Sequence, residues 1–227
     1  MTDATEPALP AESLPTPKNE SILQFLMSPK VDRMIAIIAI APFMYTTYVR
    51  FREGALNIPR VSAIIMSFLL IATMVVRRAP QRVTPNPWYW LLAFVATYGT
   101  LGPTLFSQRG IPLTPSWVSN TVALLALAII VYARMSLGKN IGFVPAQREL
   151  VTWGAYGYVR HPIYTGIFVG YTGLMMRAFS PLNLAMVLAV SALFMIKSFV
   201  EENFLKSDPQ YAAYMQKVRY RWFPGIA

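Results

Sequence analysis

The chain has 227 residues, of which 55% are hydrophobic and only 13% are charged. A soluble domain carries about 25% charged residues, so this composition indicates a multi-pass membrane protein. The net charge of +10 lies in the gaps between apolar runs, where it fits lipid headgroups and argues against nucleic-acid binding. With no cysteine and a single histidine, thiolate and histidine-rich metal sites are excluded.

The N-terminal stretch and the apolar runs divide the chain. Residues 1–28 are rich in proline and glutamate, which predicts a disordered polar tail. Six apolar runs follow, and we expect each to be a helix because lipid cannot satisfy free backbone groups. They cover Met34–Val49, Val61–Val76, Trp88–Phe106, Trp117–Met135, Ile163–Met176 and Leu182–Val200. The expected fold class is all-α: a multi-pass membrane bundle of about six transmembrane helices, the last two forming a hairpin, with a short cytoplasmic C-terminal helix.

Lysine and arginine are unevenly distributed between the two sides of this bundle. Most of them fall in the gaps on the side that holds both termini. Under the positive-inside rule, that side is cytoplasmic. Two spans separate Gly154–Gly166 from the pair Glu201–Glu202, so both clusters are expected on the cytoplasmic side.

The C-terminal segment has the pattern of a short helix. Asp208 is a good N-cap residue, and Pro209 suits the first helical position. Tyr211, Tyr214 and Val218 then share one helical face. We expect this helix to pack back over the cytoplasmic end of the bundle.

A polar turn leads into the fifth apolar run at Arg160, His161 and Pro162. A proline costs nothing in the first turn of a helix, and a helix N-terminus favours an anion. Arg160 adds a planar fork for a carboxylate, so the turn predicts an anion-binding corner. Alternatively, Arg160 is only a charge of the cytoplasmic side, His161 an interfacial polar residue and Tyr164 an aromatic of the membrane interface.

Two adjacent carboxylates, Glu201 and Glu202, end the sixth run. Facing lipid they would be costly, and a helix C-terminus disfavours negative charge. One alternative is a structural ion pair between Lys197 and Glu201, with Glu202 solvated. The other is that one carboxylate binds a cation or a pair of hydroxyls. Together with the anion corner, that arrangement suits a zwitterionic cofactor.

Residues 136–140 precede these clusters on the same side. Gly138 is a candidate helix stop, and the polar residues around it are candidates for the wall of a cofactor's nucleotide end.

These motifs, in this order, resemble the isoprenylcysteine carboxyl methyltransferase family, which is related to the phospholipid N-methyltransferases. The resemblance covers roughly residues 134–226. It is carried by Leu137–Asn140, Leu150–Gly166 with its Arg-His-Pro-x-Tyr-x-Gly core, Glu201–Glu202, Tyr211–Tyr214 and Lys217–Arg219. It implies three regions: the tail at 1–28, membrane helices of less specific sequence at 29–133, and a cofactor-binding methyltransferase region with a helical hairpin and C-terminal cap at 134–227.

The resemblance also implies a site for S-adenosylmethionine on the cytosolic side, with no metal. The cofactor-binding residues it assigns are Arg160, His161, Pro162, Tyr164, Gly166, Glu201, Glu202, Tyr211 and Tyr214. Gly166 would allow close helix packing. The catalytic residues it assigns are Glu201, Lys217 and Arg219. A glutamate would accept the proton of an amine or thiol, and a basic residue would orient a carboxylate. Residues 219–224 depart from the family's pattern, which leaves open which basic residue positions the acceptor.

The acceptor implied is lipophilic and enters from the bilayer. An isoprenylcysteine-like carboxylate is preferred, and a phospholipid amine or a small thiol is the alternative. Two other hypotheses compete: a lipid-binding membrane protein whose polar residues are structural, and a reductase-like relative that binds a nicotinamide cofactor. No glycine-rich dinucleotide fingerprint follows a strand, which weighs against the reductase. The expected partners are membrane lipids, without nucleic acid or metal.

Overall fold

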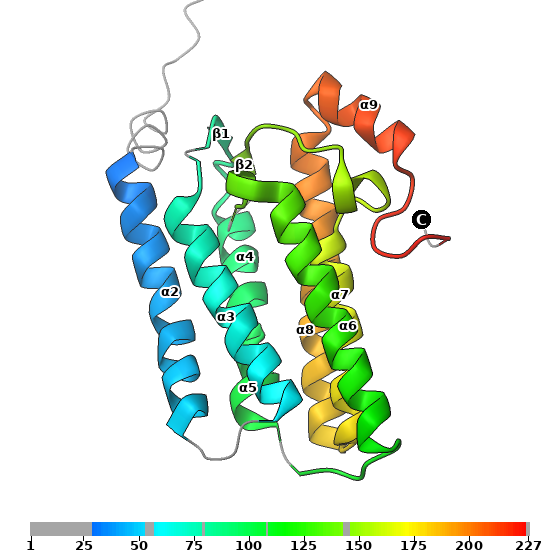
Figure 1. Ribbon diagram of the computed structural model, residues 1–227. Coiled ribbons are helices and arrows are strands. Elements are labelled where there is room, and N and C mark those ends of the chain that lie inside the picture. The colour runs from blue at the N-terminus through cyan, green and yellow to red at the C-terminus, as the bar shows by residue number, and fades with distance from the viewer. Residues whose placement is uncertain (1–28, 53–56, 79, 108, 143–145, 226–227) are drawn as a thin grey trace, which may run out of the picture.

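The computed structural model describes residues 29–52, 57–78, 80–107, 109–142 and 146–225 (Figure 1). Its helices are α2 (Pro29–Arg52), α3 (Ile58–Val76), α4 (Pro87–Gly99), α5 (Leu101–Phe106), α6 (Ser116–Leu137), α7 (Pro162–Arg177), α8 (Pro181–Leu205) and α9 (Pro209–Lys217). Each predicted apolar run is helical, which confirms the all-α class. The third run is divided into α4 and α5 at Thr100. The tail expected at 1–28 lies outside the described residues.

Length and hydropathy identify two candidate membrane spans among the described residues. They are Ser116–Asn140 and Pro181–Leu205, while Ile58–Thr73 is apolar but shorter. Large apolar side chains such as Phe68, Trp117 and Met135 are exposed on the bundle. An extensive apolar exterior is typical of an interaction with lipid or another protein. The predicted number of about six spans stays a prediction.

Several helices begin with a polar cap followed by proline. Asn57 accepts a hydrogen bond from the Arg60 backbone at 3.0 Å, and Asp208 accepts one from the Gln210 backbone at 2.9 Å. Such caps satisfy backbone N–H groups that have no partner within the helix. The predicted start of α9 at Pro209 is confirmed.

The closest helix pair is α6 with α7, which lie side by side in Figure 1. Gly166 makes this approach possible. A Cβ atom at Gly166 would overlap Ile130 and lie 3.1 Å from the Ala126 carbonyl oxygen. This is the close packing expected at Gly166, and it fixes the start of α7 against α6.

A two-stranded sheet lies at the same end of the bundle as α9 and the C-terminus (Figure 1). We call this the α9 end. Strand β1 (Arg82–Val83) pairs antiparallel with β2 (Ala146–Gln147). Gln147 Nε2 donates to Asp208 Oδ2 at 2.6 Å, which joins the sheet to the cap of α9. The sequence did not predict this sheet, because two-residue strands have no recognisable periodicity.

Helix α9 packs back over the bundle as predicted. Tyr211, Tyr214 and Val218 form a buried cluster against Leu150 and Leu205. The face inferred from the spacing of these residues is therefore confirmed. This cluster closes the α9 end next to the Arg160–His161 turn.

Candidate functional site

The turn before α7 pairs with the C-terminal segment. The backbone N–H groups of Arg160 and His161 donate to the carbonyl oxygens of Tyr220 and Arg221, both at 2.9 Å. The Tyr164 N–H donates to the His161 carbonyl at 3.0 Å. These backbone groups are therefore occupied by the protein itself, which leaves little of the predicted anion-binding corner for a ligand.

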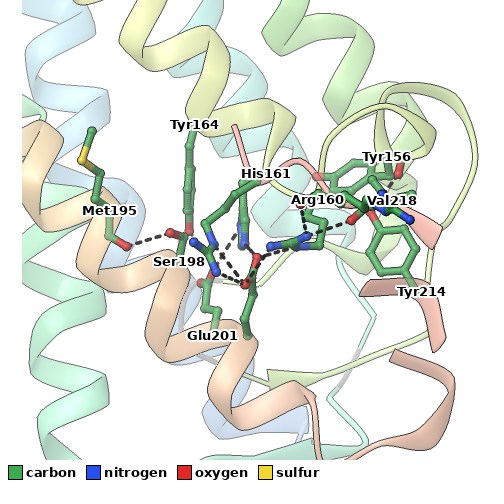
Figure 2. A network of polar contacts seen from close by, with 12 residues as sticks. Tyr156, Arg160, His161, Tyr164, Met195, Ser198, Glu201, Tyr214 and Val218 are labelled. Carbon is green, nitrogen blue, oxygen red and sulfur yellow. Dashed lines mark hydrogen bonds and ion pairs between the residues drawn. The ribbon is translucent and has the colours of Figure 1, made fainter. Parts of the chain in front are cut away.

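Arg160 forms the centre of a buried network. Its Nε and Nη2 donate to the two carboxylate oxygens of Glu202 at 2.7 and 3.2 Å. Its Nη1 donates to the carbonyl oxygens of Val218 and Arg219 at 2.8 and 2.6 Å. The fork predicted at Arg160 does bind a carboxylate, but that carboxylate is Glu202. Arg160 therefore joins α7, α8 and the C-terminal segment (Figure 2).

Glu202 accepts from a second arginine. Arg221 Nε and Nη2 donate to Glu202 Oε2 at 3.0 and 2.8 Å, and His161 Nε2 lies 3.0 Å from Glu202 Oε1. The alternative in which Glu202 is solvated is wrong, since its side chain is only 4% exposed. Two guanidinium groups stabilise the buried Glu202 carboxylate, because a buried charge needs pairing and hydrogen bonds. Arg221 could not be predicted from the sequence, because its contact with Glu202 depends on the C-terminal segment folding back.

Glu201 has a different environment from its neighbour. Tyr164 Oη donates to Glu201 Oε2 at 2.9 Å, and Lys197 Nζ lies 3.7 Å from Glu201 Oε1, so the ion pair of the first alternative is present. The Tyr164 ring stacks on His161 with centroids 5.2 Å apart. Figure 2 shows Tyr164, His161 and Glu201 gathered at one point. Because successive helical residues point about 100° apart, Glu202 enters the network while Glu201 reaches a cavity.

That cavity has a volume of about 1210 Å³ and extends along the bundle. Its wall at the α9 end includes Asn140, Tyr156, Lys197 and Glu201. Farther along, the wall is apolar and includes Leu70, Ala126, Ile130, Ile167 and Phe194. At the opposite end it includes Asn57, Arg60, Arg109 and Arg177. The cavity thus joins the polar cluster around Glu201 to an apolar chamber.

The predicted site residues fall into two groups. Those that line the cavity are Arg160, His161, Tyr164, Gly166, Glu201, Tyr211 and Tyr214. Pro162 and Glu202 are not among its lining residues. The same is true of Lys217 and Arg219, whose side chains are exposed. The cofactor and catalytic roles of all these residues stay predictions, and the exposure of Lys217 and Arg219 favours another basic residue for the acceptor.

Three tyrosines beside the cavity are held in the neutral form. Burial raises the pKa of Tyr156, Tyr211 and Tyr214. For Tyr211, the nearby Glu202 and Glu201 carboxylates raise the pKa further. Tyr214 Oη donates to the Tyr156 carbonyl at 2.8 Å. These phenols therefore act as hydrogen-bond donors and aromatic surfaces, not as bases at neutral pH.

Three polar groups of the cavity wall lack a partner among the described residues. They are Arg134 Nε, Asn140 Oδ1 and Tyr171 Oη, all shielded from solvent. The helix stop at Gly138 is confirmed, since this residue ends α6 with a φ of 57°. Asn140 does line the cavity, as expected for residues 136–140, while Ser136 instead accepts from the Ala155 backbone at 3.1 Å. An acceptor atom without a partner at Asn140 fits an amine or hydroxyl donor of a cofactor.

The described residues contain no group of three or more His, Asp or Glu side chains placed to hold a metal ion. The cavity instead offers carboxylate, amide and aromatic groups, which suit an organic cation bearing hydroxyl groups.

Two comparisons with known proteins bear on this region. Residues 116–208 match the family model for phospholipid methyltransferases. The chain is also 28% identical over 157 residues to a protein-S-isoprenylcysteine O-methyltransferase of Tribolium castaneum, a match that covers 64% of this chain. The predicted family resemblance is confirmed. The methyltransferase-like region includes α6 with Arg134, His161 at the start of α7, and α8 with Glu201. The chain spans about half the length of this relative, with 53% of it covered.

Proposed function

We propose that the protein is an integral membrane methyltransferase that uses S-adenosylmethionine to methylate a lipophilic acceptor, with an isoprenylcysteine-like carboxylate as the preferred acceptor. The observation that carries the proposal is the continuous cavity. One end presents Glu201, Tyr164 and Lys197, and the wall beyond is apolar. Such a cavity accommodates a polar cofactor and a lipid-like tail together.

The cofactor fits the α9 end by its chemistry. S-adenosylmethionine, when bound, supplies a methyl group attached to a positively charged sulfur. Glu201 is a cavity-lining carboxylate suited to its amino or ribose hydroxyl groups, and Asn140 Oδ1 offers a second acceptor. The Tyr164 ring already packs against His161 and Lys197, so Tyr214 is the aromatic that offers a surface for cation–π contact. The His161 ring lies between the two carboxylates, with Nδ1 3.8 Å from Glu201 Oε2 and Nε2 3.0 Å from Glu202 Oε1.

The acceptor fits the apolar part of the cavity. Methyl transfer requires the nucleophile and donor to be aligned in a site that excludes water. A carboxylate acceptor needs no base, so the residues only have to bind and orient it. The family model favours a second candidate, N-methylation of a phospholipid amine. In that case Glu201 is the group placed to accept the amine proton.

The proposal places the protein in a membrane with about six spans and with both termini and the site in the cytoplasm. The distribution of lysine and arginine supports this orientation, and the exposed apolar side chains support contact with lipid. The bilayer then serves both as the environment of the bundle and as the source of the acceptor.

Equilibrium binding of S-adenosylmethionine to the full chain in detergent tests the proposal. We expect saturable binding, and no binding at submillimolar cofactor would overturn it. Radiolabelled methyl transfer to N-acetyl-S-farnesylcysteine, phosphatidylethanolamine or a prenyl thiol then distinguishes O-, N- and S-methylation. A lipid-binding protein without catalysis would bind one of these acceptors but not the cofactor.

A further inference from the structure

Arg134 differs from the other arginines that reach the cavity's α9 end. Its Nη1 donates to Thr73 Oγ1 at 2.7 Å, and its Nε is shielded from solvent without a partner. Among the described residues, no carboxylate lies within ion-pair distance of Arg134. By contrast, Arg160 pairs with Glu202, and Arg148 donates to the Arg78 carbonyl oxygen at 3.2 Å. A guanidinium whose Nε is shielded and whose side-chain partner is a hydroxyl is incomplete, because buried charges are normally paired with an opposite charge.

The position of Arg134 shows where the missing anion would lie. Arg134 lines the cavity together with Tyr156 and Glu201. Helix α6 packs against the Gly154–Gly157 turn that carries Tyr156, so Arg134 and Tyr156 lie on the same side of the cavity. An anion at Arg134 would therefore lie beside the cofactor end.

The apolar wall continues from Thr73, the partner of Arg134, along α3. Leu70 and Met66 precede Thr73 by three and seven positions, so all three lie on one face of α3. Leu70 and Met66 line the cavity and are partly accessible. The cavity thus offers a cation at the α9 end and an apolar track leading away from it, which matches an amphiphile with an anionic head and an apolar tail.

We propose that Arg134 binds the carboxylate of the methyl acceptor, with the acceptor's apolar tail lying along Leu70 and Met66. This inference rests on the proposed methyltransferase function and gives the acceptor-binding role to a residue other than Lys217 or Arg219. The guanidinium donates to one carboxylate oxygen, and the other oxygen remains available as the nucleophile. That oxygen forms a bond to the methyl carbon as the carbon–sulfur bond of the cofactor breaks, so the products are a methyl ester and a neutral thioether, with no proton transferred.

The test compares two probes on the full chain in lipid nanodiscs. They are N-acetyl-S-farnesylcysteine and its carboxamide, which keeps the tail and loses the charge. We expect the wild-type protein to bind the acid at least about tenfold more tightly than the carboxamide, a difference of about 1.4 kcal/mol. In Arg134→Met this preference should fall to about twofold or less, and Arg134→Lys should retain part of it, because lysine keeps the charge but not the fork. Arg52→Met, which changes an exposed arginine outside the cavity lining, serves as the matched control and should keep the full preference.

Binding of S-adenosylmethionine is measured on the same samples. An affinity within about twofold of wild type in Arg134→Met shows a folded site, since twofold is only about 0.4 kcal/mol. If the wild type binds the cofactor but does not distinguish acid from carboxamide, or binds neither probe, the Arg134 assignment is overturned while the proposed function stands. A preference that persists in Arg134→Met overturns it as well. Failure of the wild type to bind the cofactor overturns the proposed function. If Arg134→Met does not fold, the acid preference is compared between the wild type and Arg134→Lys. A reduced preference in Arg134→Lys supports the assignment, and an unchanged preference overturns it.

Discussion

Arg160 and Glu202, 42 positions apart in the chain, form a bidentate pair with donor–acceptor distances of 2.7 and 3.2 Å. Their side chains are only 6% and 4% exposed. The same guanidinium binds the carbonyl oxygens of Val218 and Arg219. The pair is therefore a structural connection between the α7 entry, the end of α8 and the C-terminal segment, and it frees Glu201 to face the cavity.

Arg160→Met should destabilise the protein strongly. It leaves the Glu202 carboxylate with one guanidinium fewer and orphans two carbonyl oxygens, and removing one partner of a buried pair costs about 3–5 kcal/mol. Chemical unfolding in detergent, followed by tryptophan fluorescence, measures the loss. Arg78→Met is the matched control, because Arg78 pairs with Glu149 on an exposed surface where both side chains are more than half accessible. Its cost should be at most about 1 kcal/mol. Equal losses in the two variants would contradict the structural role of Arg160.

Glu201→Gln and Glu202→Gln should separate cofactor binding from stability. Glu201 lines the cavity, so Glu201→Gln should weaken S-adenosylmethionine binding at least about tenfold, or about 1.4 kcal/mol. Its effect on stability should be smaller than that of Glu202→Gln, which unpairs Arg160 and Arg221. Calorimetric binding and unfolding midpoints, measured on both variants, check the separation. The reverse pattern would show that Glu202 is the ligand-binding carboxylate.

His161→Ala should also weaken cofactor binding about tenfold or more, a change of about 1.4 kcal/mol. The imidazole stacks on Tyr164 and lies 3.0 Å from Glu202, so its removal releases both the ring that faces the cavity and the network behind it. Titration of the variant with S-adenosylmethionine measures the effect. Wild-type affinity in this variant would place the cofactor elsewhere in the cavity.

Local sequence patterns predicted those parts of the fold that depend on neighbouring residues. The start of α9 could be inferred because Asp208 and Pro209 act within one helical turn. The buried face of α9 could be inferred because Tyr211 and Tyr214 are three positions apart. Each of these features is decided by backbone geometry and helical spacing.

The divergent roles of Glu201 and Glu202 could not be predicted in the same way. Adjacent carboxylates at a helix end look equivalent in a sequence, and their roles depend on how α8 is rotated against α7. Arg221 was missed because it meets Glu202 only through the return of the C-terminal segment to the turn before α7. In the sequence, Arg134 is only one of the basic residues on the expected cytoplasmic side. Its lack of a carboxylate partner is evident only once α3 packs against α6.

Tyr211 should remain protonated at alkaline pH while the protein is folded. Burial and the adjacent glutamates raise its pKa above the ordinary tyrosine value of about 10. The unfolded chain ionises first, so the stability associated with Tyr211 is fully present below about pH 10 and is lost as pH rises further. Tyrosinate absorbance near pH 10.5 should therefore be equal in folded wild type and Tyr211→Phe. In denaturant the variant should show one tyrosinate fewer, and the same deficit in the folded state would contradict the prediction.

Gly166→Ala should destabilise the α6–α7 pair despite the better helix propensity of alanine. The added methyl group overlaps Ile130 and lies 3.1 Å from the Ala126 carbonyl oxygen, so one helix must shift. Overpacking of this kind costs about 1–3 kcal/mol. Gly170→Ala is the matched control on the same helix, because its Cβ would meet the Ala126 side chain at an ordinary 3.6 Å. Thermal unfolding should show a lower midpoint for Gly166→Ala and an unchanged or higher one for Gly170→Ala. Combining Gly166→Ala with Ile130→Ala should recover part of the loss, since it removes the overlapping atom, whereas an additive effect of the two substitutions would show that the contact with Ile130 does not limit the approach of the helices.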